Sequence, residues 1–402
     1  MRARQRMSAW RPAPRAVFAC VLAALLMVWS GSVAEAKRPP VRIGALHNLS
    51  GPLGSIGRPS LAGARLAVER LNAGGGLLGR RVRLVARDGR SEPAVVRAKA
   101  RELVHTPHLA AITGLNDTAM ALAAAPVAEK AHTVLLTSGA TSPLVPIQFP
   151  GYYFMACFGD NTQAAAGAEF AYRRLGGRTA WLLLDDTTDF TRLLARYFRE
   201  RYLQLGGDIL GEDSYAGGTT DFGAQIARIK ALPAPPDFLY IASGPDDSGR
   251  LVKQLRDAGV GGPIVSGDGY DTPRLIQDAG AAAHDVYFTT HTFLDPNTGT
   301  PRQRRFVADY EAAYGAAPRT AFAALGYDAV MLVADAIERA RSAKRTAIPA
   351  ALEATNAFPA ITGAISFAPG LHIPDKEVTV VKADGKGLAL AAVLRPDSVP
   401  AP

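Results

Sequence analysis

Two turns that carry hydroxyl groups could together bind a small anion. Thr118 and Thr141 each follow a short apolar segment, and Gly139 makes the second turn flexible. Residues 118–130, between the two turns, are rich in alanine, which predicts a helix that begins at Thr118. The free N–H groups and the positive dipole end of such a helix would point at the same place as the hydroxyls. These residue types favour a carboxylate as the ligand.

A simpler interpretation needs no ligand. Thr118 would then only cap the helix, and residues 137–141 would only form a loop. Local pattern alone favours this simpler interpretation, so the choice depends on the elements that hold the two turns.

Those elements alternate between strands and helices. Apolar strands at 109–114 and 133–137 flank the helix, which makes a βαβ unit whose two turns meet at one sheet edge. Ligands of open α/β sheets bind at that edge. The alternation starts with a strand at 41–46 and ends with strands at 377–382 and 389–394. It predicts an α/β fold with central parallel sheets.

Motifs for catalysis, cofactors and metals are weak. The sequence has no Gly-x-Ser-x-Gly elbow and no Walker loop, so it does not indicate an enzyme. The spacing Gly74-x-Gly76-x-x-Gly79 follows a predicted helix and leads into a strand, the reverse of a dinucleotide site, and is interpreted as a turn. His105-x-x-His108 is interpreted as a solvated helix end. No cofactor and no metal are predicted.

The first 36 residues have the pattern of a cleavable signal peptide. Five arginines precede an apolar segment at 17–29, and Ala34-Glu35-Ala36 gives a small-x-small cleavage site. Lipoprotein processing at Cys20 is the alternative, which the short apolar run before it disfavours. Thirteen apolar residues are too few to span a membrane, so we expect an exported, soluble protein in the periplasm.

Removal of this segment lowers the formal net charge from +9 to about +5 and leaves Cys157 as the single cysteine. The mature chain can therefore form no intrachain disulfide. Its basic residues are spread along the sequence, which gives no support for nucleic-acid binding.

Several short motifs, in order and spacing over about residues 41–394, resemble one family. They are Leu49-Ser50-Gly51-Pro52, Leu71-Asn72-Ala73-Gly74-Gly75, Thr137-x-x-Ala140-Thr141, Thr220-Asp221-Phe222, Leu255-Arg256-Asp257-Ala258-Gly259 and Gly326-Tyr327-Asp328-Ala329. This combination resembles the substrate-binding proteins of ABC importers for branched-chain amino acids, the leucine/isoleucine/valine-binding family.

The resemblance implies a type I periplasmic-binding fold, in which two Rossmann-like lobes joined by three crossings close on a small ligand. Residues 37–158 and 291–362 would form lobe 1, and residues 159–290 and 363–402 would form lobe 2. The crossings are expected near Cys157–Asp160, Phe288–His291 and Thr362–Gly363.

The resemblance also implies a set of ligand-binding residues. Thr118 and Thr141 would grip the carboxylate, and the backbone at Gly139 and Ala140 would complete that side, with Gly139 meeting the ammonium group. Lobe 2 would supply Asp268 for the ammonium and Phe190 as an aromatic lid. Tyr327 aligns with a pocket-lining tyrosine, although it fits the core of its helix equally well.

Three positions depart from the leucine-binding pattern, namely Ile56, Ala156 and Gly244. Leucine specificity is therefore not carried over. An amino acid with another side chain, or an acid or amide without an ammonium group, stays open.

The function implied is that of a periplasmic substrate-binding component, a monomer that binds an amino acid or related small carboxylate and delivers it to an ABC permease in the inner membrane. The alternative is a ligand-sensing module for an amide or an aromatic or aliphatic acid.

Overall fold

Residues 39–402 are described by a computed structural model, in which residues 40–402 form one compact unit. The predicted signal peptide lies outside the described residues. Among helices of residues 39–402, none is both long enough and apolar enough to cross a membrane.

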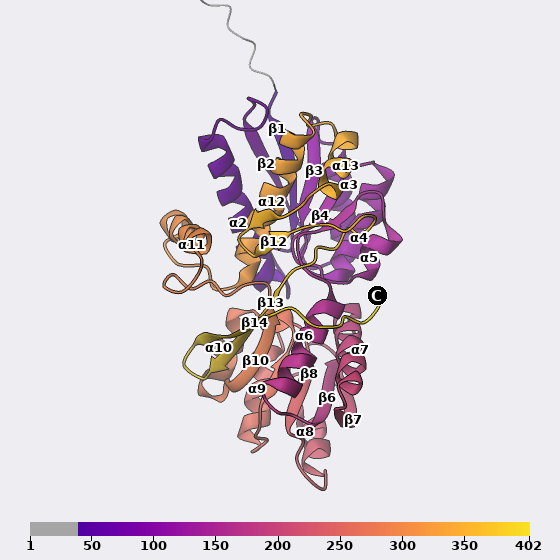
Figure 1. The fold of residues 1–402 in the computed structure, drawn as a ribbon, viewed down its shortest axis with the longest axis vertical. Coiled ribbons are helices and arrows are strands. Elements are labelled where there is room, and N and C mark those ends of the chain that lie inside the picture. The colour runs from indigo at the N-terminus through magenta and orange to yellow at the C-terminus, as the bar shows by residue number, and fades with distance from the viewer. Residues whose placement is uncertain (1–38) are drawn as a thin grey trace, which may run out of the picture. The chain divides into compact units, whose positions relative to one another are not determined.

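Lobe 1 is built on a five-stranded parallel sheet of order β2-β1-β3-β4-β5 (Figure 1). Its strands are β1 (Val41–His47), β2 (Val82–Asp88), β3 (Leu109–Gly114), β4 (Leu135–Thr137) and β5 (Tyr153–Met155). Its helices are α2 (Gly54–Ala73), α3 (Pro93–Val104), α4 (Thr118–Lys130), α5 (Leu144–Gln148), α11 (Pro301–Tyr314), α12 (Ala321–Arg339) and α13 (Ile348–Glu353).

Lobe 2 is built on a seven-stranded sheet of order β14-β13-β10-β9-β8-β6-β7. Its strands are β6 (Thr179–Asp185), β7 (Asp208–Tyr215), β8 (Phe238–Ala242), β9 (Ile264–Ser266), β10 (His284–Thr290), β13 (Val378–Asp384) and β14 (Leu388–Leu394). Its helices are α6 (Asp160–Arg173), α7 (Asp189–Gln204), α8 (Gly223–Lys230), α9 (Ser248–Asp257) and α10 (Pro273–Ala279).

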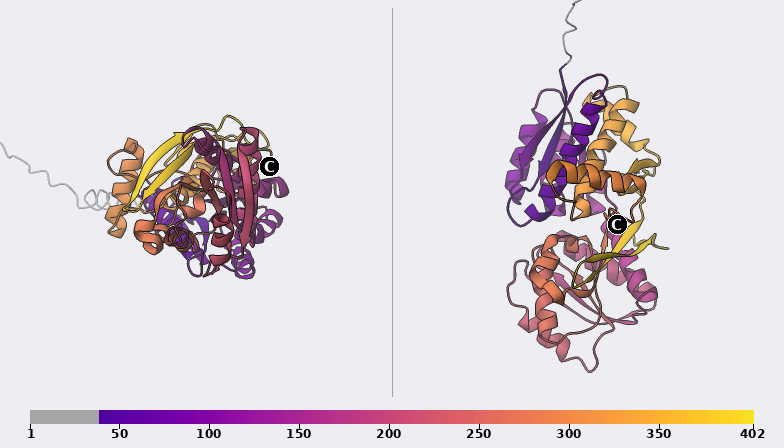
Figure 2. Two further views of the ribbon diagram at one scale, coloured as in Figure 1. Left: turned by 90° about the horizontal axis from the view of Figure 1, so that it is seen from below. Right: turned by 90° about the vertical axis from the view of Figure 1, so that its left-hand side faces the viewer.

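The C-terminal strands differ from the parallel arrangement that the alternation predicts. β13 pairs antiparallel with β10, and β14 pairs antiparallel with β13, at the edge of the lobe 2 sheet (Figure 2). No helix separates β13 from β14, so the two strands form a hairpin, which must be antiparallel.

Helix α2 begins at Gly54, close to the turn Leu49-Ser50-Gly51-Pro52, and contains Pro59 in its interior. The N–H groups of Ile56 and Gly57 donate to the carbonyl of Leu53, which closes the first turn before the proline is reached. Ile56 is thereby placed on a helix rather than on a loop.

Two glycines let α2 and α12 pack backbone to backbone. A Cβ atom on Gly63 would lie 1.8 Å from the carbonyl oxygen of Ala323, and one on Gly326 would lie 1.9 Å from that of Ser60. Any larger residue would push the helices apart. This close approach brings the N-terminal end of α12 next to the start of α2.

A short hairpin pairs β11 (Phe358–Ala360) with β12 (Gly363–Ile365), across the expected crossing at Thr362–Gly363. The ring of His372 then bonds to the carbonyl of Tyr153 in lobe 1, and the chain joins the lobe 2 sheet only at β13. The exact lobe ranges remain a prediction.

Candidate ligand-binding site

A small cavity of about 80 Å³ is lined by residues of both lobes. Lobe 1 contributes the start of α2, the loop after β3, the loop after β4 and the first turn of α12, and lobe 2 contributes the start of α7 and the loops after β8 and β9. The lining residues are Leu53, Ile56, Asn116, Asp117, Thr118, Gly139, Thr141, Thr188, Phe190, Gly244, Pro245, Asp268, Gly269 and Phe322. The carboxyl ends of strands from both sheets thus meet at one place, as expected for ligand sites of α/β folds.

Thr118 is the first residue of α4 and is not its cap. The cap is Asp117, whose side chain accepts a hydrogen bond of 3.1 Å from the backbone N–H of Met120. The Thr118 hydroxyl is therefore not used for capping. It is 2% exposed and its Oγ1 has no hydrogen-bond partner. A buried hydroxyl without a partner costs free energy, which a ligand acceptor would recover.

Gly139 makes room for two neighbours in the cavity wall. A Cβ atom on it would lie 2.8 Å from Nδ2 of Asn116 and 2.9 Å from Cε1 of Phe322. Its N–H donates to the carbonyl of Leu115, and the Thr137 hydroxyl also accepts from it at 3.3 Å. The N–H is therefore occupied, and the Gly139 carbonyl is the backbone group that could face a ligand.

Asp268, from the loop after β9, brings a buried carboxylate into the cavity. One oxygen accepts from the Gln163 amide at 2.9 Å, and the other lies 3.2 Å from Nε2 of His291. A carboxylate only accepts, so the histidine donates its Nε2–H. Burial lowers the pKa of His291, although Asp268 opposes this shift. A neutral histidine leaves the negative charge of Asp268 uncompensated, so the carboxylate could receive an ammonium group.

A second buried carboxylate lies behind Asp268. The same Gln163 amide nitrogen donates to Asp160 at 2.9 Å, while Oδ2 of Asp160 has no partner. Burial, and then the charge of Asp268, raise the pKa of Asp160 to about 8. The protonated form of Asp160 is therefore favoured at neutral pH, because burial and then the neighbouring charge of Asp268 both disfavour its ionisation.

The structure brings five of the seven predicted site residues together in the cavity wall: Thr118, Gly139, Thr141, Phe190 and Asp268. The other two lie elsewhere. Ala140 is buried behind the wall, where its N–H donates to the Thr137 hydroxyl at 2.9 Å. Tyr327 packs edge-on against Phe306 in a separate hollow on lobe 1, because its position on α12 faces α11 rather than the cavity.

Several lining residues were not predicted as ligand contacts. Asn116 and Asp117 stand in the same turn as Thr118, and that shared turn was a signal for both. Thr188 caps α7, accepting from the N–H of Thr191, and stands two residues before the predicted lid, Phe190. Phe322 comes from α12, and no local pattern could place it at the cavity, because the α2–α12 packing does so.

Two of the three departures from the leucine-binding pattern lie in the wall. Ile56 and Gly244 line the cavity from opposite lobes. Ala156 is fully buried outside it, and its carbonyl accepts a 3.0 Å hydrogen bond from Nζ of Lys376. Ile56 and Gly244 are therefore the departures that can act on the ligand.

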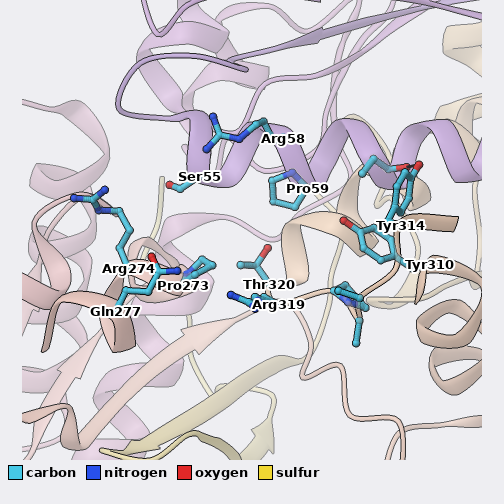
Figure 3. A pocket seen from close by; sticks show the side chains of 14 residues that line it. Ser55, Arg58, Pro59, Pro273, Arg274, Gln277, Tyr310, Tyr314, Arg319 and Thr320 are labelled. Atoms are coloured by element: carbon cyan, nitrogen blue, oxygen red, sulfur yellow. Dashed lines mark hydrogen bonds between the residues drawn. The ribbon is translucent and has the colours of Figure 1, made fainter. Parts of the chain in front are cut away.

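A larger hollow of about 530 Å³ adjoins the start of α2 (Figure 3). Arg58, Arg274 and Arg319 line it, together with Tyr310 and Tyr314. It contains none of the predicted site residues, and the candidate site is the smaller cavity.

Two α/β lobes thus enclose a small cavity whose mainly apolar wall carries a few polar groups. A family model described as periplasmic binding protein matches residues 40–387. The chain belongs to this family, and the predicted family and fold class are confirmed.

The relatives are named for binding branched-chain amino acids. Leu/Ile/Val-binding protein homolog 7 of Brucella abortus (strain 2308) is 26% identical over 334 residues, which cover 79% of this chain and 81% of the relative. The crystal structure of the leucine-binding protein LivK from Thermotoga maritima MSB8 has a TM-score of 0.82 and 32% identity, over 89% of this chain and 99% of that one. The branched-chain amino acid transporter substrate-binding protein LivJ from Streptococcus pneumoniae, in complex with isoleucine, has a TM-score of 0.82 and 29% identity, over 89% of this chain and 100% of that one.

Proposed function

We propose that the cavity binds an amino acid or a related small carboxylate, without converting it, and that the protein delivers this ligand to an ABC permease in the inner membrane. The names of the relatives and the family support the transport role. The family and the basic–apolar N-terminal pattern support a periplasmic location after signal-peptide cleavage. The chain would act as a monomer.

One observation carries the proposal. The Thr118 hydroxyl, buried and without a partner at the start of α4, lines the same cavity as the buried carboxylate of Asp268. An α-amino acid matches this pair, because its carboxylate can accept from Thr118 and the N-terminal amides of α4 while its ammonium meets Asp268. Closure of the two lobes would then exclude water from both ends of the ligand.

The test begins with a thermal-shift screen of the mature protein against L-amino acids, amides and small carboxylic acids, since a true ligand raises the melting temperature by mass action. Calorimetric titration of the strongest compound then compares native protein with Thr118→Ala. A lost charge-assisted hydrogen bond of about 1.5–3 kcal/mol predicts affinity weakened about tenfold or more.

Thr106→Ala is the matched control, because that hydroxyl donates to the carbonyl of Glu102 on the surface of lobe 1. It should leave the affinity unchanged. Unchanged affinity of Thr118→Ala for the bound compound would refute the site. A ligand that binds equally well after loss of its α-amino group would refute the role of Asp268.

A further inference from the structure

Asn116 is a polar residue of the cavity wall with no role in the proposed binding of the ligand's carboxylate and ammonium groups. Its side chain is 8% exposed, and neither Oδ1 nor Nδ2 has a hydrogen-bond partner. It stands two residues after the end of β3, and it lies over the space that a side chain at Gly139 would occupy. The amide thus offers the donors of its Nδ2 and the acceptor Oδ1 at the cavity wall.

Another buried polar side chain, His47, lies close enough to Asn116 to share a hydrogen bond with it. Burial lowers the pKa of His47 to about 4, against a smaller upward effect of Asn116, so the imidazole is neutral at pH 7. Both ring nitrogens of His47 are also without a partner. A single hydrogen bond between the two side chains would use one end of the amide, and the other end would still be free for a ligand.

An apolar ligand side chain would leave this amide unpaired. A buried polar group without a partner costs more than a hydrogen bond gains, so a site of this kind discriminates strongly against ligands that lack the matching group. Apolar contacts for a ligand come from both lobes, from Leu53, Ile56 and Phe322 on one side and from Phe190 and Pro245 on the other. The preference for a polar ligand side chain therefore depends on Asn116 itself.

The negative charges of the cavity wall also limit which ligand side chains can bind. The carboxylates of Asp117 and Asp268 both line the cavity. Asp117 already caps α4, and Asp268 is the partner proposed for the ammonium. A second carboxylate on the ligand would be repelled by them, whereas a neutral group that both donates and accepts would not.

We infer that Asn116 selects the ligand by its side chain, which would be a neutral polar group such as a hydroxyl or a carboxamide rather than a branched alkyl group. This inference rests on the proposed function and adds the class of amino acid. It follows from the unpartnered amide of Asn116 at the cavity wall.

The test uses two pairs of amino acids of nearly equal shape, L-threonine with L-valine and L-asparagine with L-leucine. Calorimetric titration of the mature protein should give, in at least one pair, an affinity for the polar member about tenfold or more above that for the apolar member. Asn116→Leu should abolish or reverse this preference, because the new side chain offers only apolar contacts.

Two further variants serve as a second test and as a control. Asn116→Ala should also remove the preference, and it covers the case in which Asn116→Leu fails to fold, as judged by circular dichroism. Asn356→Leu makes the same exchange at an exposed site outside the cavity and should change nothing.

Failure of the inference and failure of the proposed function would give different results. If the apolar members bind as well as or better than the polar ones, and Asn116→Leu leaves their affinities unchanged, the inference is overturned while the proposed function stands. If no amino acid of either pair binds and Thr118→Ala has no effect on any compound of the screen, the proposed function is overturned together with the inference.

Discussion

At the scale of the residue, the candidate site combines groups whose ordinary protonation states are changed by burial. Gln163 donates one amide nitrogen to two carboxylates, those of Asp160 and Asp268. Protonation of Asp160 relieves the repulsion between them and leaves the charge of Asp268 for the ligand. The amide of Gln163 therefore holds Asp268 in place from outside the cavity.

The raised pKa of Asp160 predicts a pH-dependent stability. An aspartate of the unfolded chain titrates near 3.8, whereas burial and the charge of Asp268 raise the pKa in the folded protein to about 8. Between these values the folded state binds the extra proton, so the contribution of Asp160 to stability falls as the pH rises from about 4 to 8.

Asp160→Asn should remove this fall, because the amide resembles the protonated acid at every pH. Urea unfolding from pH 4 to 8 gives the free energy of unfolding of both proteins. The value for the native protein minus that for the variant should decrease by up to about 1.4 kcal/mol per pH unit. His47 titrates in both proteins and cancels in the difference. Parallel stability profiles for the two proteins would contradict the protonated state of Asp160.

At the scale of the element, two helices begin at the cavity. Asp117 caps α4 in lobe 1, and Thr188 caps α7 in lobe 2, and both caps line the cavity wall. The positive ends of both helix dipoles therefore lie near the proposed carboxylate position.

Loss of the α4 cap should affect stability and binding together. Asp117→Ala removes the acceptor of the Met120 N–H, which should cost about 0.5–2 kcal/mol of stability and weaken binding by misplacing Thr118. Thr300→Ala is the matched control, since Thr300 forms a capping box on α11 and does not line the cavity. Denaturant unfolding should show a comparable loss for both variants, and titration should show weaker binding only for Asp117→Ala. Native affinity in Asp117→Ala would contradict the role of the helix start.

The elements with strong periodicity were predictable. The bounds of α4 and β3 agree with the prediction, since an alanine-rich run and an apolar strand leave little ambiguity. Short helices were missed: α5, α10 and α13 span seven residues or fewer, too few to show a helical period. Only the simpler, ligand-free interpretation placed the cap of α4 one residue late, because Asp117 and Thr118 are both good capping residues and sequence alone does not choose between them.

At the scale of the whole molecule, the contacts that hold the lobes join residues distant in sequence. Asp271 accepts from the hydroxyl of Thr290 at 2.6 Å and from the N–H of Ala321, the first residue of α12, at 2.9 Å. Lys376 is buried and binds the carbonyl of Ala156 across the first crossing. Such tertiary contacts leave no local signal, and for this reason the place of Phe322 was beyond sequence reasoning.

The family resemblance supplied what local pattern could not. It placed Asp268 and Phe190 opposite Thr118, residues that no periodicity connects, and the structure brings all three to one cavity. It also carried Tyr327 to the site, whereas the structure packs that ring edge-on against Phe306.

The most direct test of the central claim is a crystal structure of the mature protein with the compound selected by the thermal-shift screen. We expect the ligand in the cavity between the lobes, with its carboxylate within hydrogen-bond distance of the Thr118 hydroxyl at the start of α4 and its amino group facing Asp268. A ligand bound outside this cavity, or held in it with the carboxylate turned toward Asp268, would contradict the account.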